Sequence, residues 1–277
     1  MDQSKMFELQ LTSGVQFMAV KNLIRDFGCF EAIVDISSTG LSLQAKDLNN
    51  RDTLVLHLNR NAFDHYHCDH NFSMGIGIYW VFNILDCAFC DYTIKIKGGD
   101  NGNDTVLFTI KGHREDEILQ VSYKLWEYEN ECFNIHRGEY EVTVDMPSEE
   151  FRRICKILHD FSNTATISVA NERVKFSARV DNGSADSNLP KSINSLEVVV
   201  MGSYDLFLVS LVQPKETATV YTDLTDPVSF SFSLENWHSF TMATSISKMV
   251  MIKMSLGLPV VVEYTIEHKG YMRFDLS

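Results

Sequence analysis

The chain has 277 residues, enough for two domains of ordinary size, and 45% of them are hydrophobic, including 18 phenylalanines, so buried cores can form. Its formal net charge of −13 excludes a protein whose whole surface attracts nucleic acid, although a local basic surface can exist on an acidic body. The six cysteines show no disulfide framework and the N-terminus has no apolar leader core, so we expect a soluble protein of a reducing intracellular compartment.

The first half of the chain alternates predicted strands and helices. Alternating apolar and polar residues predict a strand over Phe7–Leu11, and Ser13 is placed to cap a helix that runs to Phe27. The further elements expected in this half are the strands Ile33–Ser37, Leu41–Ala45 and Thr53–Leu58, a second helix over Ile76–Cys87, and the strands Thr93–Lys97 and Thr105–Ile110.

The second half repeats this order after an acidic connector, Trp126–Gly138. The elements expected there are a strand Tyr140–Asp145, a helix Ser148–Phe161, a hairpin of Thr166–Ala170 and Arg173–Ala178, a strand Val228–Ser233, a helix Leu234–Ala243, and the strands Val250–Ser255 and Val260–Ile266. Each half is therefore rich in strands and has two helices, which indicates an α+β fold.

The two halves also match residue by residue. Apolar residues at helical spacing in the first helix have counterparts in the third helix, at one constant displacement along the chain: Phe17, Val20, Ile24 and Phe27 against Phe151, Ile154, Leu158 and Phe161. The hairpins that follow match as well: Leu41, Leu43 and Ala45 against Val174, Phe176 and Ala178. A repeat of this length is a domain rather than a solenoid unit. We therefore predict a first domain over residues 1–125, a connector over 126–139 and a second domain over 140–277.

Four stretches carry a resemblance to a known family: Asp35–Asp47, Phe63–Gly75, Met146–Lys156 and Leu258–Tyr264. They resemble the eukaryotic DNA sliding clamps, the proliferating cell nuclear antigen family, and nearly the whole chain from Met6 aligns in order. The resemblance implies two tandem clamp domains per chain and a closed trimeric ring whose helices line a hole for duplex DNA. It also implies pairing between subunits through edge strands near Ile118–Leu125 and Arg179–Leu189. The second of these edges is unusually polar.

A ring that encircles DNA needs basic residues on its inner helices, because these contact the phosphates and bind without sequence preference. The resemblance assigns DNA binding to eight residues: Lys21, Arg25, His67, His70, Arg152, Arg153, Lys156 and His159. The alternative is a solvated amphipathic helix face. Other positions depart from the family, since Asn83, Asp86, Glu235 and Met242 stand where the family has basic residues, and this weakens the expected attraction for DNA.

The resemblance further implies a docking pocket for short partner peptides. Its residues here would be Lys46, Phe133, Ile135, Tyr140, Pro259, Phe274 and Leu276. The aromatic anchors of a partner peptide bind best in a pocket that excludes water. Lys46 and Asp275 add charge to this pocket, so docking is expected to be weakened. Packing of the connector alone explains Phe133 and Ile135 equally well. The lysine that the family modifies is Asn171 here, so modification at that position is excluded.

An insertion near residues 190–216 distinguishes this chain from the family. Its portion Leu196–Val212 is apolar and rich in β-branched residues. Three explanations compete: an extra hairpin, a segment absent from the mature protein, and, less favoured, a partner surface. An exposed apolar tract of this kind promotes aggregation unless it is covered.

Chemistry by the chain itself is not expected. The cluster of His65, His67, Cys68 and His70, with the Cys87 and Cys90 pair, raises the question of zinc, but the resemblance places Cys68 and Cys87 at ordinary family positions. No catalytic residue, metal or other cofactor is therefore predicted, and the protein is not expected to be an enzyme.

These observations favour a sliding clamp that tethers DNA polymerase during replication and repair in the nucleus. The partners implied are double-stranded DNA bound without sequence preference, DNA polymerase and other clamp-binding proteins, a clamp loader, and two further copies in a homotrimer, with no membrane. The alternative is a degenerate paralogue, an interaction module with a clamp fold that does not encircle DNA productively.

Overall fold

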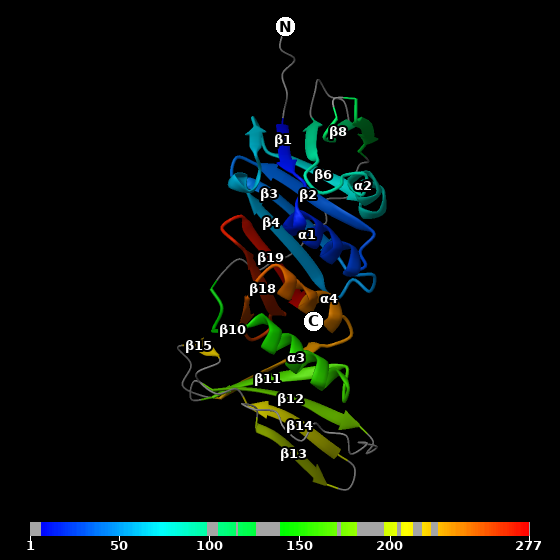
Figure 1. Ribbon diagram of the computed structural model, residues 1–277. Helices are drawn as coiled ribbons and strands as arrows, with labels where there is room; N and C mark the ends of the chain where they lie inside the picture. The colour runs from blue at the N-terminus through cyan, green and yellow to red at the C-terminus, as the bar shows by residue number, and fades with distance from the viewer. Residues whose placement is uncertain are drawn as a thin grey trace. The chain divides into compact units, whose positions relative to one another are not determined.

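The structure, a computed structural model, describes residues 7–98, 105–114, 116–125, 139–170, 173–181, 197–203, 206–212, 218–222 and 227–276. The chain divides into two compact units: Met1–Asn134 with Thr265–Met272, and Ile135–Tyr264 with Arg273–Ser277. In each unit the described strand pairs are antiparallel and helices accompany the sheets (Figure 1). This architecture confirms the prediction of two tandem α+β domains.

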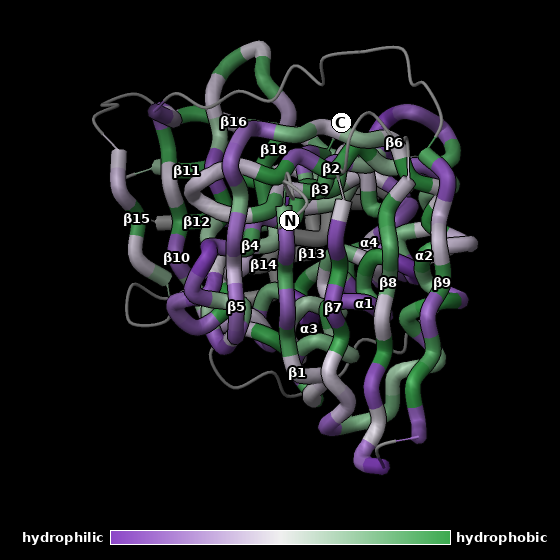
Figure 2. Tube along the Cα trace, turned by 90° about the horizontal axis from the view of Figure 1, so that it is seen from above, coloured by the Kyte–Doolittle hydropathy of each residue, from purple (hydrophilic) through white to green (hydrophobic). Residues whose placement is uncertain are grey.

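The first unit contains the helices α1 (Val15–Asp26) and α2 (Ile78–Leu85) and a short 3-10 helix, η1 (Arg60–Ala62). Its strands are β1 (Phe7–Thr12), β2 (Glu31–Ser37), β3 (Gly40–Lys46), β4 (Thr53–Asn59), β5 (His65–Cys68), β6 (Phe72–Gly77), β7 (Thr93–Gly98), β8 (Thr105–Lys111) and β9 (Ile118–Lys124). One sheet has the order β5-β1-β7-β8-β9, and a second group has the order β4-β3-β2-β6. Figure 2 shows the first of these sheets with its strands side by side and with hydrophobic and hydrophilic residues alternating along them.

The start of α1 differs from the prediction. Gly14 rather than Ser13 is the N-cap, and no side chain caps the helix. The Ser13 hydroxyl is buried and has no hydrogen-bond partner among the described residues. Instead, the Ser13 backbone bridges to the loop before β7: its N–H donates to the Tyr92 carbonyl (2.7 Å) and its carbonyl accepts from the Asp91 N–H (2.6 Å). Ser13 thus stabilises this region through its backbone.

The second unit contains α3 (Ser148–His159), the short helix α4 (Trp237–Thr241) and the 3-10 helix η2 (Met242–Ser245). Its strands are β10 (Val142–Pro147), β11 (Thr164–Ala170), β12 (Arg173–Asp181), β13 (Glu197–Ser203), β14 (Leu206–Val212), β15 (Thr219–Thr222), β16 (Val228–Ser233), β17 (Met249–Met254) and most of β18 (Val260–Ile266) and β19 (Gly270–Leu276). They are ordered β13-β14-β12-β11-β16 and β15-β10-β17-β18-β19.

A cluster of phenylalanines fills the core of the second unit. Phe151 of α3 lies near Phe176 of β12 and Phe240 of α4, with ring centroids 6.3 Å and 6.2 Å away. Phe240 in turn lies near Phe232 and Phe274, at 6.3 Å and 6.4 Å. All five side chains are at most 2% exposed. Burial of such large aromatic side chains is the dominant favourable contribution to a core of this kind.

The inserted segment forms an additional hairpin. β13 and β14 pair with each other, and β14 pairs with β12 from Leu206 opposite Asp181 to Val212 opposite Lys175. Of the three explanations for the insertion, the structure therefore forms the extra hairpin. The predicted pairing edge near Arg179–Leu189 is not an open edge where it is described, because the end of β12 is covered by β14. The polar stretch 182–190 lies outside the described residues.

Candidate nucleic-acid interface

Helix α3 presents the basic residues that the sequence predicted. Its apolar face is buried through Phe151, Ile154 and Leu158, each at most 1% exposed. The remaining face carries Lys156, which is exposed, and three half-buried residues, Arg152, Arg153 and His159. This division into an apolar and a cationic face follows the helical period. The structure therefore brings these four predicted residues together on one helix.

Two of these residues also have partners within the unit. The Arg153 guanidinium donates to both carboxylate oxygens of Glu150, at 3.0 Å and 2.6 Å. The His159 ring lies against Trp237, with centroids 5.7 Å apart. Arg153 is thus partly neutralised by its own helix, whereas Lys156 points its charge into solvent. Lys156 and Arg152 are the α3 cations best suited to attract phosphate.

Helix α1 offers a different arrangement. Lys21 is only 3% exposed, so it does not present its ammonium group at the surface. Its Nζ donates to Asp86 Oδ1 at 2.6 Å, and the exposed Arg25 donates to Asp86 Oδ2, also at 2.6 Å. Asp86 is the residue immediately after α2, so one carboxylate links the two helices and opposes both cations. Lys21 is consequently a poor candidate for DNA contact, and Arg25 is already engaged.

The pKa of Asp86 reflects this arrangement. Partial burial would by itself raise the pKa of the carboxyl group, but the hydrogen bonds and positive charges of Lys21 and Arg25 outweigh burial and lower it. Asp86 is therefore ionised at neutral pH and holds the two cations permanently. The surface around the ends of α1 and α2 carries less positive charge than its sequence suggests.

The remaining DNA-binding predictions fall on exposed positions. His67 and His70 are exposed, and His67 Nε2 lies 3.2 Å from Asp69 Oδ1. Of the residues that depart from the family, Asn83 and Glu235 are exposed and Met242 is half-buried. The structure thus leaves the DNA-binding role of His67 and His70 as a prediction.

The residues predicted for partner docking differ in how deeply they are buried. Phe274 is fully buried and Leu276 is 1% exposed, so both belong to the core of the second unit and present no surface to a peptide. Lys46, at the end of β3, is half-buried, and Pro259 is exposed. Phe133 and Ile135 lie outside the described residues, as does Asn171.

Tyr140 belongs to a polar cluster at the end of β19. The Arg273 guanidinium donates to the Tyr140 hydroxyl at 2.8 Å and to Asp275 Oδ2 at 3.0 Å. Burial is the largest influence on the pKa of Tyr140 and raises it. The positive charge of Arg273 lowers this pKa, and the negative charge of Asp275 raises it. Within the second unit, the Asp275 carboxylate neutralises Arg273, which is 7% exposed. The effect of Asp275 on partner docking stays a prediction.

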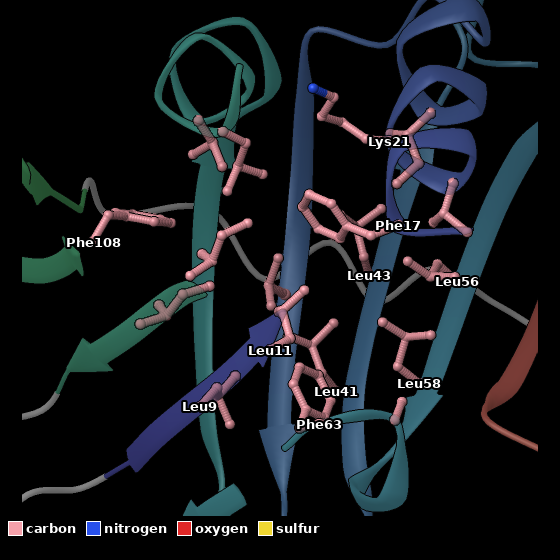
Figure 3. Close-up of a pocket in the computed structure, with 18 of the residues that line it drawn as sticks. Leu9, Leu11, Phe17, Lys21, Leu41, Leu43, Leu56, Leu58, Phe63 and Phe108 are labelled. Carbon is pink, nitrogen blue, oxygen red and sulfur yellow. The ribbon is translucent and has the colours of Figure 1, made fainter. Parts of the chain in front are cut away.

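An apolar cavity of about 260 Å³ lies in the first unit. Its walls come from both helices and both groups of strands, and include Phe17, Ile24, Leu43, Leu56 and Phe108 (Figure 3). Leu43 occupies the position that Phe176 holds in the repeat, so a leucine lines a space where the second unit has a buried aromatic ring. Three charged residues, Lys21, Asp64 and Lys269, also line this cavity, whose walls are otherwise mostly apolar.

Across the described ranges, no three histidine, cysteine or acidic side chains are grouped as metal ligands would be. Within the same ranges, no helix is both long and apolar enough to cross a membrane.

Comparisons with known proteins place this geometry in a family. The family model "Proliferating cell nuclear antigen, N-terminal domain" matches residues 6–132, and "Proliferating cell nuclear antigen, C-terminal domain" matches residues 134–277. A relative from Dictyostelium discoideum, described as proliferating cell nuclear antigen, is 34% identical over 272 residues, which cover 98% of each chain. The duplicated domain and these matches together show that the chain belongs to the proliferating cell nuclear antigen family.

Proposed function

We propose that this protein is a DNA sliding clamp that raises the processivity of a DNA polymerase. The observation that carries this function is the match of both halves of the chain, in order, to the two domains of the proliferating cell nuclear antigen family. A clamp acts by topology: closure around the duplex prevents dissociation, and weak contacts with the phosphates allow sliding. Such contacts require cations and no recognition of bases.

Helix α3 is the proposed main contact with DNA. Lys156 and Arg152 lie on its solvent side, while its apolar side anchors the helix in the phenylalanine core. In the first unit, Lys21 and Arg25 both donate to the Asp86 carboxylate, so that unit contributes less to the attraction for DNA. The proposed ring therefore attracts DNA mainly through its second domains.

The partners of the proposed clamp are a DNA polymerase, other clamp-binding proteins and a clamp loader, and its compartment is the nucleus. Docking is proposed around Tyr140 and Pro259, with Lys46, Phe133 and Ile135 retained from the sequence. Phe274 and Leu276 are withdrawn from this surface because they are core residues. Neither catalytic activity nor a cofactor is proposed.

A second candidate function is an interaction module that folds as a clamp without encircling DNA productively. The observation that favours it is Asp86, which places a negative charge at the ends of α1 and α2 and engages the basic residues there. Such a module would bind the subunits of another clamp and modulate its ring.

Primer extension on a singly primed circular template separates the two functions. The reaction contains polymerase, a clamp loader, ATP and this protein. A clamp lengthens the products of a single polymerase encounter, and Arg152→Ala with Lys156→Ala reduces that effect. The interaction module predicts a different result. This protein would then not lengthen the products by itself, but it would change the product length obtained with another clamp when the two are mixed.

A further inference from the structure

The cavity of the first unit has an apolar interior. In Figure 3 the side chains of Phe17, Leu43 and Leu56 lie around one space between α1 and the strands. Leu43, Leu56 and Phe108 are each at most 5% exposed, so this part of the wall is buried. A buried water molecule needs roughly two to four polar partners, and apolar side chains supply none. The interior therefore favours an apolar occupant over water.

Polar side chains line one end of the same cavity. Thr12 and Gln16 flank Gly14, at which α1 begins, and Thr12 Oγ1 donates to Asp64 Oδ2 at 2.8 Å. Gln16 is half-buried, whereas Thr12 and Asp64 are exposed, so these residues mark the end of the cavity that is nearest to solvent. A mostly apolar wall with a few polar groups at one end is typical of small-molecule sites, in which the polar groups orient the ligand.

The charged residues of the wall do not favour an ionic ligand. Lys21 Nζ donates to Asp86 Oδ1 at 2.6 Å, so its positive charge is already balanced. Asp64 would repel an anion at the polar end, and Lys21 and the exposed Lys269 would repel a cation. Burial of a charge without a partner is also costly. These observations favour a neutral ligand.

The second repeat shows what fills the matched space there. Phe176 occupies the position that Leu43 holds in the first repeat, and its ring centroid lies 6.3 Å from that of Phe151. Both phenylalanines are 0% exposed, so aromatic rings of the protein itself complete that core. Phe17 is the counterpart of Phe151, but its partner across the core is a leucine. A flat aromatic molecule would therefore supply the ring that the first unit lacks.

The volume of the cavity limits the size of such a molecule. An apolar cavity of about 150 Å³ holds one benzene ring, so a cavity of about 260 Å³ has room for nearly two. We propose that this cavity binds a neutral molecule of two fused aromatic rings, with its one polar group toward Thr12 and Gln16. Phe82 and Phe108 in the wall offer aromatic edges and faces to the ligand. The site lies within one unit, so the inference does not depend on DNA binding or on a ring.

Indole, a soluble molecule of this size with a single N–H group, is the probe for the ligand class. At ten times its dissociation constant, indole should raise the ratio of folded to unfolded full-length chain about elevenfold. Differential scanning calorimetry should show this as a rise of about 3–6 °C in Tm. An indole carboxylic acid, which is ionised at neutral pH, should give no rise. Equal stabilisation by the two compounds would contradict a neutral ligand, and no stabilisation by indole would overturn the site.

Two variants test whether indole binds in the cavity. Leu43→Phe extends a ring into the space, so it should raise the dissociation constant of indole at least about threefold, measured by isothermal titration calorimetry. Leu48→Phe is the matched control: the same change at a leucine that is 59% exposed and outside the wall should leave the dissociation constant unchanged. Equal dissociation constants for both variants and the native chain would overturn the proposal.

The native chain provides a second readout that needs no variant to fold. Nuclear Overhauser effects between indole protons and the methyl groups of Leu43 and Leu56 are expected, because both side chains line the cavity. Effects confined to Leu48 and other exposed side chains would place indole on the surface and overturn the proposal.

Discussion

Lys21 is a buried ammonium group whose position depends on one carboxylate. A buried cation is costly to the fold unless it is paired, and removal of one partner leaves the other uncompensated. Asp86 is 40% exposed, so solvent screens part of this interaction. Because Asp86 also binds Arg25, the same carboxylate connects α1 with the end of α2.

We predict that Asp86→Asn lowers the free energy of unfolding by about 1–3 kcal/mol, less than for a fully buried pair because of that screening. Adding Lys21→Leu should recover much of the loss, since the unpaired ammonium is replaced by an apolar side chain of a type that fits the core. Urea denaturation of the two single variants and the double variant measures the coupling. Strictly additive effects would show that the two residues do not interact.

The acid sensitivity of the fold should also depend on Asp86. Its pKa is lower in the folded chain than in the unfolded chain, so its contribution to stability is complete above the unfolded value of about 3.9. That contribution is lost as the pH falls through the lower, folded pKa. Thermal unfolding between about pH 2 and pH 6 should therefore lose less stability in Asp86→Asn than in the native chain. Parallel curves for the two proteins would contradict the assignment.

DNA affinity should respond more strongly to α3 than to α1. We predict that Lys156→Ala weakens binding to duplex DNA and reduces the slope of log affinity against log salt by about 1. Arg25→Ala should change that slope less, because its guanidinium is bonded to Asp86. Fluorescence anisotropy across a salt series compares the two. An equal or larger effect of Arg25→Ala would place the main contact on α1.

Single residues show where sequence reasoning succeeded and failed. The cationic side of α3 was predictable because its apolar residues keep a strict helical period. Lys21 was assigned to DNA binding by resemblance. It lies four residues after Phe17 and three before Ile24, however, and so belongs to the buried face of the helix. That spacing was the available signal. The burial of Phe274 and Leu276 was missed because the tail was assigned by resemblance, not by the alternation of β19.

At the scale of elements, the cavity beneath α1 distinguishes the two repeats. The first unit has Leu43 where the second has Phe176, and a space of about 260 Å³ remains among the apolar walls (Figure 3). Unfilled apolar volume forfeits dispersion contacts and lowers stability.

We predict that Leu43→Phe stabilises the chain by about 1 kcal/mol, because the aromatic ring enters existing space. The matched change in the other repeat, Phe176→Leu, should destabilise by roughly 1–3 kcal/mol, because it opens a space in a filled core. Differential scanning calorimetry of both variants gives the two signs. Destabilisation by Leu43→Phe would indicate that the cavity cannot admit a ring.

Helices and strands were predictable from the sequence where both copies of the repeat show the same hydrophobic pattern. The helices α1 and α3 and the hairpin β2–β3 were expected close to their observed bounds. The strands β5 and β6 were missed. β5 is only four residues long and two of its residues are exposed, so its alternation was weak. Helix α4 is shorter than expected, because Leu234–Asn236 do not join it and a 3-10 turn follows. The insertion had no counterpart in the repeat, so its pairing with β12 could not be predicted.

At the scale of the whole molecule, duplication explains how one chain can contribute two similar domains to the proposed ring. The repeat and the resemblance predicted the fold class from sequence, and the matches to both family domains confirm it. What the repeat did not reveal is the asymmetry between its copies. The second unit has a filled core, a cationic α3 and an extra strand, whereas the first has a cavity and a carboxylate that engages its cations.

Retention on circular DNA tests the central claim of a topological clamp most directly. The protein is loaded by a clamp loader onto nicked circular DNA, isolated by gel filtration at raised salt, and followed after the circle is cut once. We expect the protein to stay on circular DNA at raised salt, which would release a protein held only by contacts with phosphates. We expect it to leave once the DNA is linear. Equal loss from circular and linear DNA would contradict encirclement and support the interaction module.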